Sequence, residues 1–141
     1  MADDNILKLA CDNKGHHMII LIIKKYPTHI KNEIFDYIMA HFGQLARDKN
    51  GLCVMKELIH TASKGEAAKI AAIMAQLQND MLGYAQHEFG NYVVQHALKY
   101  FPYDKCQEIF ACLLGNFTRL SMDKYSSNLI EFAIQKADEG L

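Results

Sequence analysis

Apolar residues recur along the chain at the spacing of an amphipathic helix, three, four, seven and eight positions after a glycine or a serine. After Gly90 these positions hold Val93, Val94, Ala97 and Leu98. After Ser126 they hold Leu129, Ile130, Ala133 and Ile134. The pattern predicts a helix after each of these two residues, with one stripe buried in a core.

Other amphipathic segments flank these helices. One kind begins near Pro27, Ser63 and Pro102, where proline or serine suits a helix start. A shorter kind precedes the glycine or serine, as in residues 6–11 and 45–48. Each unit is therefore predicted to contain a short helix, a tight corner, a middle helix and a longer outer helix.

The units repeat along the sequence. Gly15, Gly51, Gly90 and Ser126 occupy equivalent positions, spaced by 36, 39 and 36 residues. A period in the upper thirties is typical of solenoids, whose units bury their apolar faces by stacking on one another. The sequence predicts an all-α solenoid, a single domain over residues 1–141 with repeats at approximately 5–42, 43–77, 78–117 and 118–141.

The fourth unit reaches its middle helix and then has no room for an outer one before residue 141. Terminal repeats need a polar outer face to remain soluble. We therefore expect either that the chain is a fragment of a longer array or that another element covers this end.

Composition supports a packed core, because 50% of the 141 residues are hydrophobic. The longest aliphatic run, residues 18–23, is too short to span a bilayer and is expected to form a buried helix. Asp3 and Asp4 stand where a signal peptide would carry positive charge, so no membrane partner and an intracellular, cytoplasmic location are expected. A net charge of −1 is unusual for a nucleic-acid binder, and Lys24, Lys25, Lys99, Lys105 and Arg119 form no evident stripe in the sequence.

Metal binding and catalysis find little support. The four cysteines lie within helical patterns and are expected to be reduced thiols. The sequence has no Cys-x-x-Cys pair and no histidines spaced i, i+4, so neither a metal nor another cofactor is predicted. Phosphate-binding glycine loops, paired catalytic carboxylates and nucleophile elbows are also missing, so we do not expect an enzyme.

Polar residues follow the corner in the third and fourth units. Asn91 and Gln95 stand four positions apart, as do Ser127 and Glu131, so the members of each pair share one helix face. An amide offers a donor and an acceptor that match the uracil edge, whereas glutamate only accepts and suits the N1–H and amine of guanine. Tyr92, between the first pair, can lie against the face of a base.

These residues resemble the base-reading helices of Pumilio proteins, through Phe89–His96 and Ser126–Glu131, in a likeness that spans about residues 6–137. The resemblance implies a right-handed α-solenoid of three-helix repeats whose middle helices line a concave face and read one base each. It implies that Asn91 and Gln95 read U with Tyr92 stacking. It also implies that Ser127 and Glu131 read G with Asn128 between bases.

Pumilio repeats bind RNA antiparallel, so the resemblance implies that the last two units read 5′-GU-3′, as the sixth and seventh of eight repeats would within a UGUA element. The implied partner is single-stranded messenger RNA, bound in its 3′-untranslated region to repress or destabilise it. Protein effectors on the convex face are a further possibility.

The first two units depart from the pattern. The second has Leu52, Cys53 and Lys56, of which Cys53 offers weak packing on a base and Lys56 a phosphate contact. The first has His16 and His17, followed by an isoleucine at the fifth position. For His16, His17, Leu52 and Cys53, helix packing or surface exposure is as plausible as a base contact.

A second class of function stays open. A helical-repeat scaffold would bind protein through its outer faces, and the Pumilio-like proteins of ribosome assembly hold structured RNA without a base code, with a nucleolar location. The weak first two units and the neutral charge favour this alternative, whereas the two complete patterns oppose it.

Overall fold

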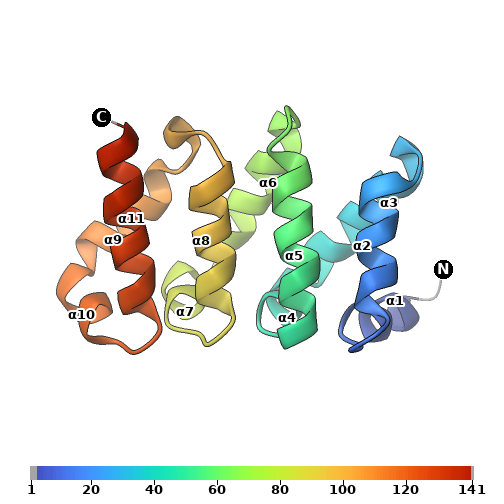
Figure 1. Ribbon diagram of the computed structural model, residues 1–141, viewed down its shortest axis with the longest axis horizontal. Coiled ribbons are helices and arrows are strands. Elements are labelled where there is room, and N and C mark those ends of the chain that lie inside the picture. The colour runs from blue at the N-terminus through green and yellow to red at the C-terminus, as the bar shows by residue number, and fades with distance from the viewer. Residues whose placement is uncertain (1–2, 141) are drawn as a thin grey trace.

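The computed structural model describes residues 3–140, and it contains eleven α-helices, one short 3₁₀ helix and no strand over that range (Figure 1). The helices are α1 (Asp3–Ala10), α2 (His16–Lys25), α3 (Thr28–Ala40), α4 (Phe42–Ala46), α5 (Lys49–Ala62), α6 (Ala67–Gln78), α7 (Met81–Ala85), α8 (Gly90–Tyr100), η1 (Tyr103–Lys105), α9 (Gln107–Gly115), α10 (Phe117–Met122) and α11 (Ser126–Gly140).

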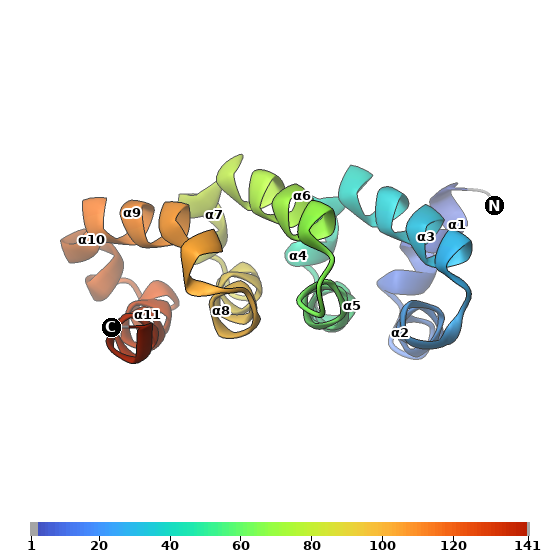
Figure 2. The same ribbon diagram turned by 90° about the horizontal axis from the view of Figure 1, so that it is seen from above.

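The helices form two layers. The middle helices α2, α5, α8 and α11 lie side by side in chain order, with the short helices α1, α4, α7 and α10 at one end of them (Figure 1). The outer helices α3, α6 and α9 form a second layer behind (Figure 2). The predicted all-α solenoid is confirmed, and α11 is the last helix among the residues described.

Stacking of the middle helices creates the core. Val54, Val93 and Leu129 occupy the same position in the second, third and fourth units, and all three are completely buried. Met18 holds that position in α2 and is exposed, because α2 has a neighbouring middle helix, α5, on one side only. Burial of one such aliphatic side chain contributes about 1.5–3 kcal/mol, so contact between units provides much of the stability.

The aliphatic run at residues 18–23 is therefore only partly buried. Ile19 and Ile23 lie in the core, whereas Met18 and Leu21 are exposed. The expectation of a buried helix was wrong for that second pair of side chains.

The corner before each middle helix is tight. A Cβ added at Gly51 would lie 2.5 Å from the carbonyl oxygen of Leu45, six residues earlier, and glycine avoids this clash. In the fourth unit Ser126 has the equivalent position, and its Oγ donates a hydrogen bond to the Leu120 carbonyl at 2.7 Å. The serine thus makes a favourable contact with the very group that the glycines approach.

A side-chain acceptor holds each corner closed. Asp48 Oδ2 accepts from the backbone N–H groups of Asn50 and Gly51, at 2.9 and 2.8 Å. Asp12 and Asp123 make the equivalent pair of bonds in the first and fourth units. These N–H donors lower the pKa of both carboxyl groups. In the third unit the acceptor is His87 Nδ1.

Two predicted helix boundaries differ from the structure. Ser63 follows the end of α5, and its Oγ donates to the His60 carbonyl at 2.6 Å, so it caps a helix end instead of starting α6. The short helix predicted at residues 45–48 occupies Phe42–Ala46, because Asp48 is needed as the corner cap. Pro27 does immediately precede α3, and Pro102 precedes the 3₁₀ turn η1.

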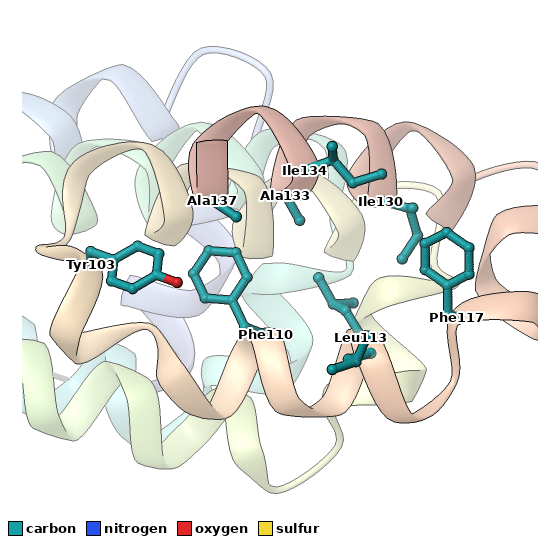
Figure 3. Close-up of a pocket in the computed structure, with 9 residues that line it drawn as sticks. Tyr103, Phe110, Leu113, Phe117, Ile130, Ala133, Ile134 and Ala137 are labelled. Carbon is teal, nitrogen blue, oxygen red and sulfur yellow. The ribbon is translucent and has the colours of Figure 1, made fainter. Parts of the chain in front are cut away.

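The C-terminal end of the solenoid carries an apolar depression of about 260 Å³ between α9, α10 and α11. Side chains of α11 face Phe110 and Leu113 of α9 across it, with Phe117 beside them (Figure 3). Ile134 lines this depression and is 56% exposed, whereas Leu98, its counterpart in α8, is fully buried. α8 packs between α5 and α11, but α11 packs against a middle helix on one side only.

Candidate functional site

The middle helices carry the predicted site residues in three parallel rows. Equivalent positions in successive units define each row. The first row is His16, Leu52, Asn91 and Ser127; the second is His17, Cys53, Tyr92 and Asn128; the third is Ile20, Lys56, Gln95 and Glu131. Because α2, α5, α8 and α11 lie side by side, the rows run across all four units (Figure 1).

In the third unit, the first-row residue supports the third-row residue. Asn91 is 2% exposed, and its Nδ2 donates to the backbone carbonyls of His87 and Glu88, at 2.8 and 3.0 Å. Its Oδ1 accepts a hydrogen bond of 2.9 Å from Gln95 Nε2. Within residues 3–140 the Gln95 side chain makes no other hydrogen bond, so the remainder of its amide can meet a ligand.

Tyr92 presents its ring beside this amide pair. Tyr92 is 42% exposed, so its ring is accessible from solvent. The Nζ of Lys56, from the second unit, lies 5.8 Å from the ring centroid. A flat apolar surface with a cation at its side is suited to a planar ring attached to a phosphate.

The fourth unit offers a different set of groups. Ser127 is half-buried, and its Oγ donates to the Lys124 carbonyl at 3.3 Å. Asn128 and Glu131 are both exposed on α11. An ionised carboxylate at the third-row position accepts hydrogen bonds and donates none.

The first two units contribute unevenly to the face. His16 is buried, its Nδ1 lies 2.8 Å from the Asp12 carbonyl, and Leu52 is buried as well. These positions favour the helix-packing alternative for His16 and Leu52. His17, Cys53 and Lys56, in contrast, line a depression of about 350 Å³ across α2, α5 and α8.

The sequence did not single out several residues of that depression. Lys24, Glu57, His60, His96 and Tyr100 line it too. The rings of His60 and His96 both lie against Tyr100, with centroids 4.8 and 5.7 Å apart. Each of these residues lies one, four or five positions after the third-row residue of its own helix, so the repeat register could have located them.

His96 is held in its neutral form. Its pKa falls from 6.5 to about 4, first because the ring is buried and then because Lys56, Lys99 and His60 lie nearby; a hydrogen bond to the Tyr92 carbonyl acts in the opposite direction. Lys24 and Lys56 line the depression beside the third row, with Glu57 as the one carboxylate in the same lining.

The residues described contain no group of three or more His, Cys, Asp or Glu side chains placed to hold a metal ion. All four cysteines are free, and burial raises the pKa of Cys106 to about 11. No helix within residues 3–140 has the length and apolarity needed to cross a membrane.

These features define a class of protein, a helical-repeat protein with amide, carboxylate and aromatic side chains in rows along its middle helices. The family model of the Pumilio-family RNA binding repeat matches residues 41–72, 81–114 and 116–140, which together make up more than half of the chain. The chain belongs to the Pumilio family of RNA-binding repeat proteins.

Its curated relatives agree with this assignment. Pumilio homolog 12 of Arabidopsis thaliana is 29% identical over 134 residues, which cover 95% of this chain and 22% of the relative. Suppressor protein MPT5 of Saccharomyces cerevisiae is 28% identical over 137 residues, 94% of this chain and 16% of the relative. The chain spans about a fifth of the length of the curated relatives it matches.

Solved structures share the fold. The RNA-binding domain of yeast Puf5p bound to SMX2 RNA has a TM-score of 0.81 and 27% identity, over 96% of this chain and 38% of the other. PUF-8 in complex with PBE-RNA has a TM-score of 0.89 and 13% identity, over 96% and 40%. The second likeness, at that identity, shows the solenoid fold alone.

Proposed function

We propose that this chain binds single-stranded RNA with one base per unit and reads 5′-GU-3′ with its last two units. The observation that carries the proposal is the Asn91–Gln95 amide pair beside the exposed ring of Tyr92, with Ser127, Asn128 and Glu131 in the same rows of the next unit. The likeness to Puf5p, whose domain was solved bound to RNA, supports it.

The chemistry differs between the two units. Gln95, fixed from behind by Asn91, presents an amide edge that can donate to a uracil carbonyl and accept from its N3–H. Glu131 presents only acceptors, which match the N1–H and amine of guanine and reject uracil. Hydrogen bonds to a charged group are worth about 1.5–3 kcal/mol, so the G unit is expected to be the more selective.

The expected affinity is modest. Two stacking slots at about 1–3 kcal/mol each give at most about 6 kcal/mol, whereas micromolar binding requires about 8. We therefore propose that the chain acts within a longer Pumilio array that binds a UGU-type element in the 3′-untranslated region of messenger RNA. Repression of that messenger in the cytoplasm, with effector proteins on the convex face, and the absence of enzymatic activity are part of the same proposal.

Fluorescence anisotropy with short labelled RNAs at low salt tests this function. A UGUA-containing oligomer is expected to bind more tightly than matched oligomers in which the G is replaced by A or by C. Equal affinity for the three oligomers would contradict base reading.

One observation favours a second candidate, a scaffold for protein or structured ribosomal RNA without a base code. In the first two units, Leu52 and Ile20 stand where base-edge groups are needed, and His16 is buried. A scaffold of this kind would bind a structured RNA at least as well as the UGUA oligomer, so adding a hairpin RNA to the same titrations separates the candidates.

A further inference from the structure

Cationic and imidazole side chains form a fourth row, one helical turn beyond the third. Lys24, His60 and Lys99 occupy equivalent positions in α2, α5 and α8, four residues after Ile20, Lys56 and Gln95. Residues spaced i, i+4 share one face of a helix, so this row runs parallel to the predicted base-reading rows. In the fourth unit the position holds Gln135, which is neutral.

The row borders two neighbouring depressions. The first, of about 350 Å³, contains Lys24 and His60. The second, of about 240 Å³, contains Lys99 and Gln135 together with Lys136 of α11. The first depression lies across α2, α5 and α8 and the second between α8 and α11, so together they involve all four middle helices.

The lining of these two depressions is more positive than the chain as a whole. It holds four lysines (Lys24, Lys56, Lys99 and Lys136) against two carboxylates (Glu57 and Glu139), whereas the whole chain has a net charge of −1. Glu131, in the third row of α11, is the next acidic group on the same face. A chain with a net charge of −1 thus has a local excess of positive charge. The lysines that produce it are far apart in the sequence and align only when the repeats are superposed.

Aromatic rings accompany the cations. Lys99 Nζ lies 5.2 Å from the ring centroid of Tyr100, and His60 packs against that same ring. His96 lies among the same groups: its pKa is lowered first by burial and then by the nearby Lys56, Lys99 and His60.

We propose that Lys24, His60 and Lys99 form a phosphate track, which binds the sugar–phosphate backbone of RNA alongside the base-reading rows. This inference rests on the proposed function, because it names the part of the RNA that the fourth row contacts. Each cation neutralises one phosphate and releases counterions, whatever the base sequence. The first two units, which lack base-reading edges, thereby contribute to affinity without contributing to sequence preference.

The test is the salt dependence of binding. The affinity of the chain for the UGUA oligomer is measured by anisotropy at several salt concentrations, for the unaltered chain and for a Lys24→Gln, Lys99→Gln double variant. For single strands the slope of log K against log salt is about −0.7 for each phosphate neutralised. The double variant lacks two of these contacts, so its slope is expected to be less negative by about 1.4. Its preference for G over A should not change.

The matched control is Lys105→Gln, which removes an exposed lysine from the outer side of the solenoid, next to α6. Its slope should equal that of the unaltered chain. Lys24 and Lys99 are exposed, and thermal unfolding is expected to show that both variants fold normally.

The outcomes separate the two proposals. The phosphate track is overturned if the salt slope of the double variant equals that of the unaltered chain, or if the Lys105→Gln control changes the slope by the same amount. This holds even if the base preference is intact. A reduced slope without any base preference retains the track and removes the base code. No binding of the RNA at low salt overturns both.

Discussion

Gln95 Nε2 donates a 2.9 Å hydrogen bond to Oδ1 of Asn91, and Asn91 is itself fixed by two backbone carbonyls. The two residues therefore have different roles before any ligand arrives. Asn91 is a buried support, and Gln95 is the half-buried group that it orients.

This difference predicts that alanine substitutions separate stability from recognition. Asn91→Ala removes a buried side chain with three hydrogen bonds, so the free energy of unfolding should fall by about 1–3 kcal/mol. Gln95→Ala should change stability by less, but should abolish the preference for U over C at its position. Urea unfolding and anisotropy measure the two effects. Equal destabilisation by both substitutions would contradict the supporting role of Asn91.

The fourth unit allows a change of specificity. Ser127→Asn combined with Glu131→Gln copies the third-unit pair onto α11, where both positions are accessible. Replacing the acceptor-only carboxylate with an amide should shift preference at that base from G toward U. The expected change in the G-to-U affinity ratio is about tenfold or more, since a bond to a charged group contributes about 1.5–3 kcal/mol.

Anisotropy with UGUA and UUUA oligomers measures this shift. The reverse pair, Asn91→Ser with Gln95→Glu, is not a suitable control because it changes the buried Asn91. Lys105→Gln, at an exposed position outside the rows, is the control, and its preference for G should equal that of the unaltered chain. A variant that still prefers G would show that other residues read this base.

The repeat pattern was sufficient to predict the fold. Stripes such as Val93, Val94, Ala97 and Leu98 predict the middle helices, and the spacing of the glycines predicts how they stack. Helix ends were less predictable, because serine suits either end. Ser63 caps the end of α5, and only its hydrogen bond to the His60 carbonyl distinguishes the two cases.

The candidate site was less accessible to sequence reasoning. Periodicity places Asn91 and Gln95 on one face but does not show that Asn91 is buried and already bonded. The row of Lys24, His60 and Lys99 was missed because these residues are far apart in the chain and come into one row only through the stacking of α2, α5 and α8. Extending the repeat register one turn beyond Gln95 would have revealed it.

The exposed C-terminal end predicts unequal costs for equivalent substitutions. Leu98→Ala leaves a cavity in a fully buried site, so it should lower the free energy of unfolding by about 2–5 kcal/mol. Ile134→Ala, at the same position of the last unit, should cost much less because the side chain is 56% exposed. Urea unfolding of both variants checks the difference. Similar costs would mean that the apolar depression of Figure 3 is covered in solution.

The neutral state of His96 predicts a pH dependence of stability. Its pKa is about 4 in the folded protein and 6.5 when unperturbed, so between these values the unfolded chain binds more protons than the native chain. Stability should therefore fall as the pH drops from about 6.5 to about 4, and this contribution should level off at lower pH.

His96→Gln removes that contribution and retains a polar side chain of similar length. The melting temperature of the unaltered chain, measured by circular dichroism at pH 7.0, 5.5 and 4.5, should fall more steeply than that of the variant. The other six histidines and the capping carboxylates Asp12 and Asp123 are present in both proteins, so their titration cancels in the comparison. Parallel curves would mean that His96 takes up its proton at an ordinary pH in the native state, and that the groove around Lys56 and Lys99 is less positive than its geometry indicates.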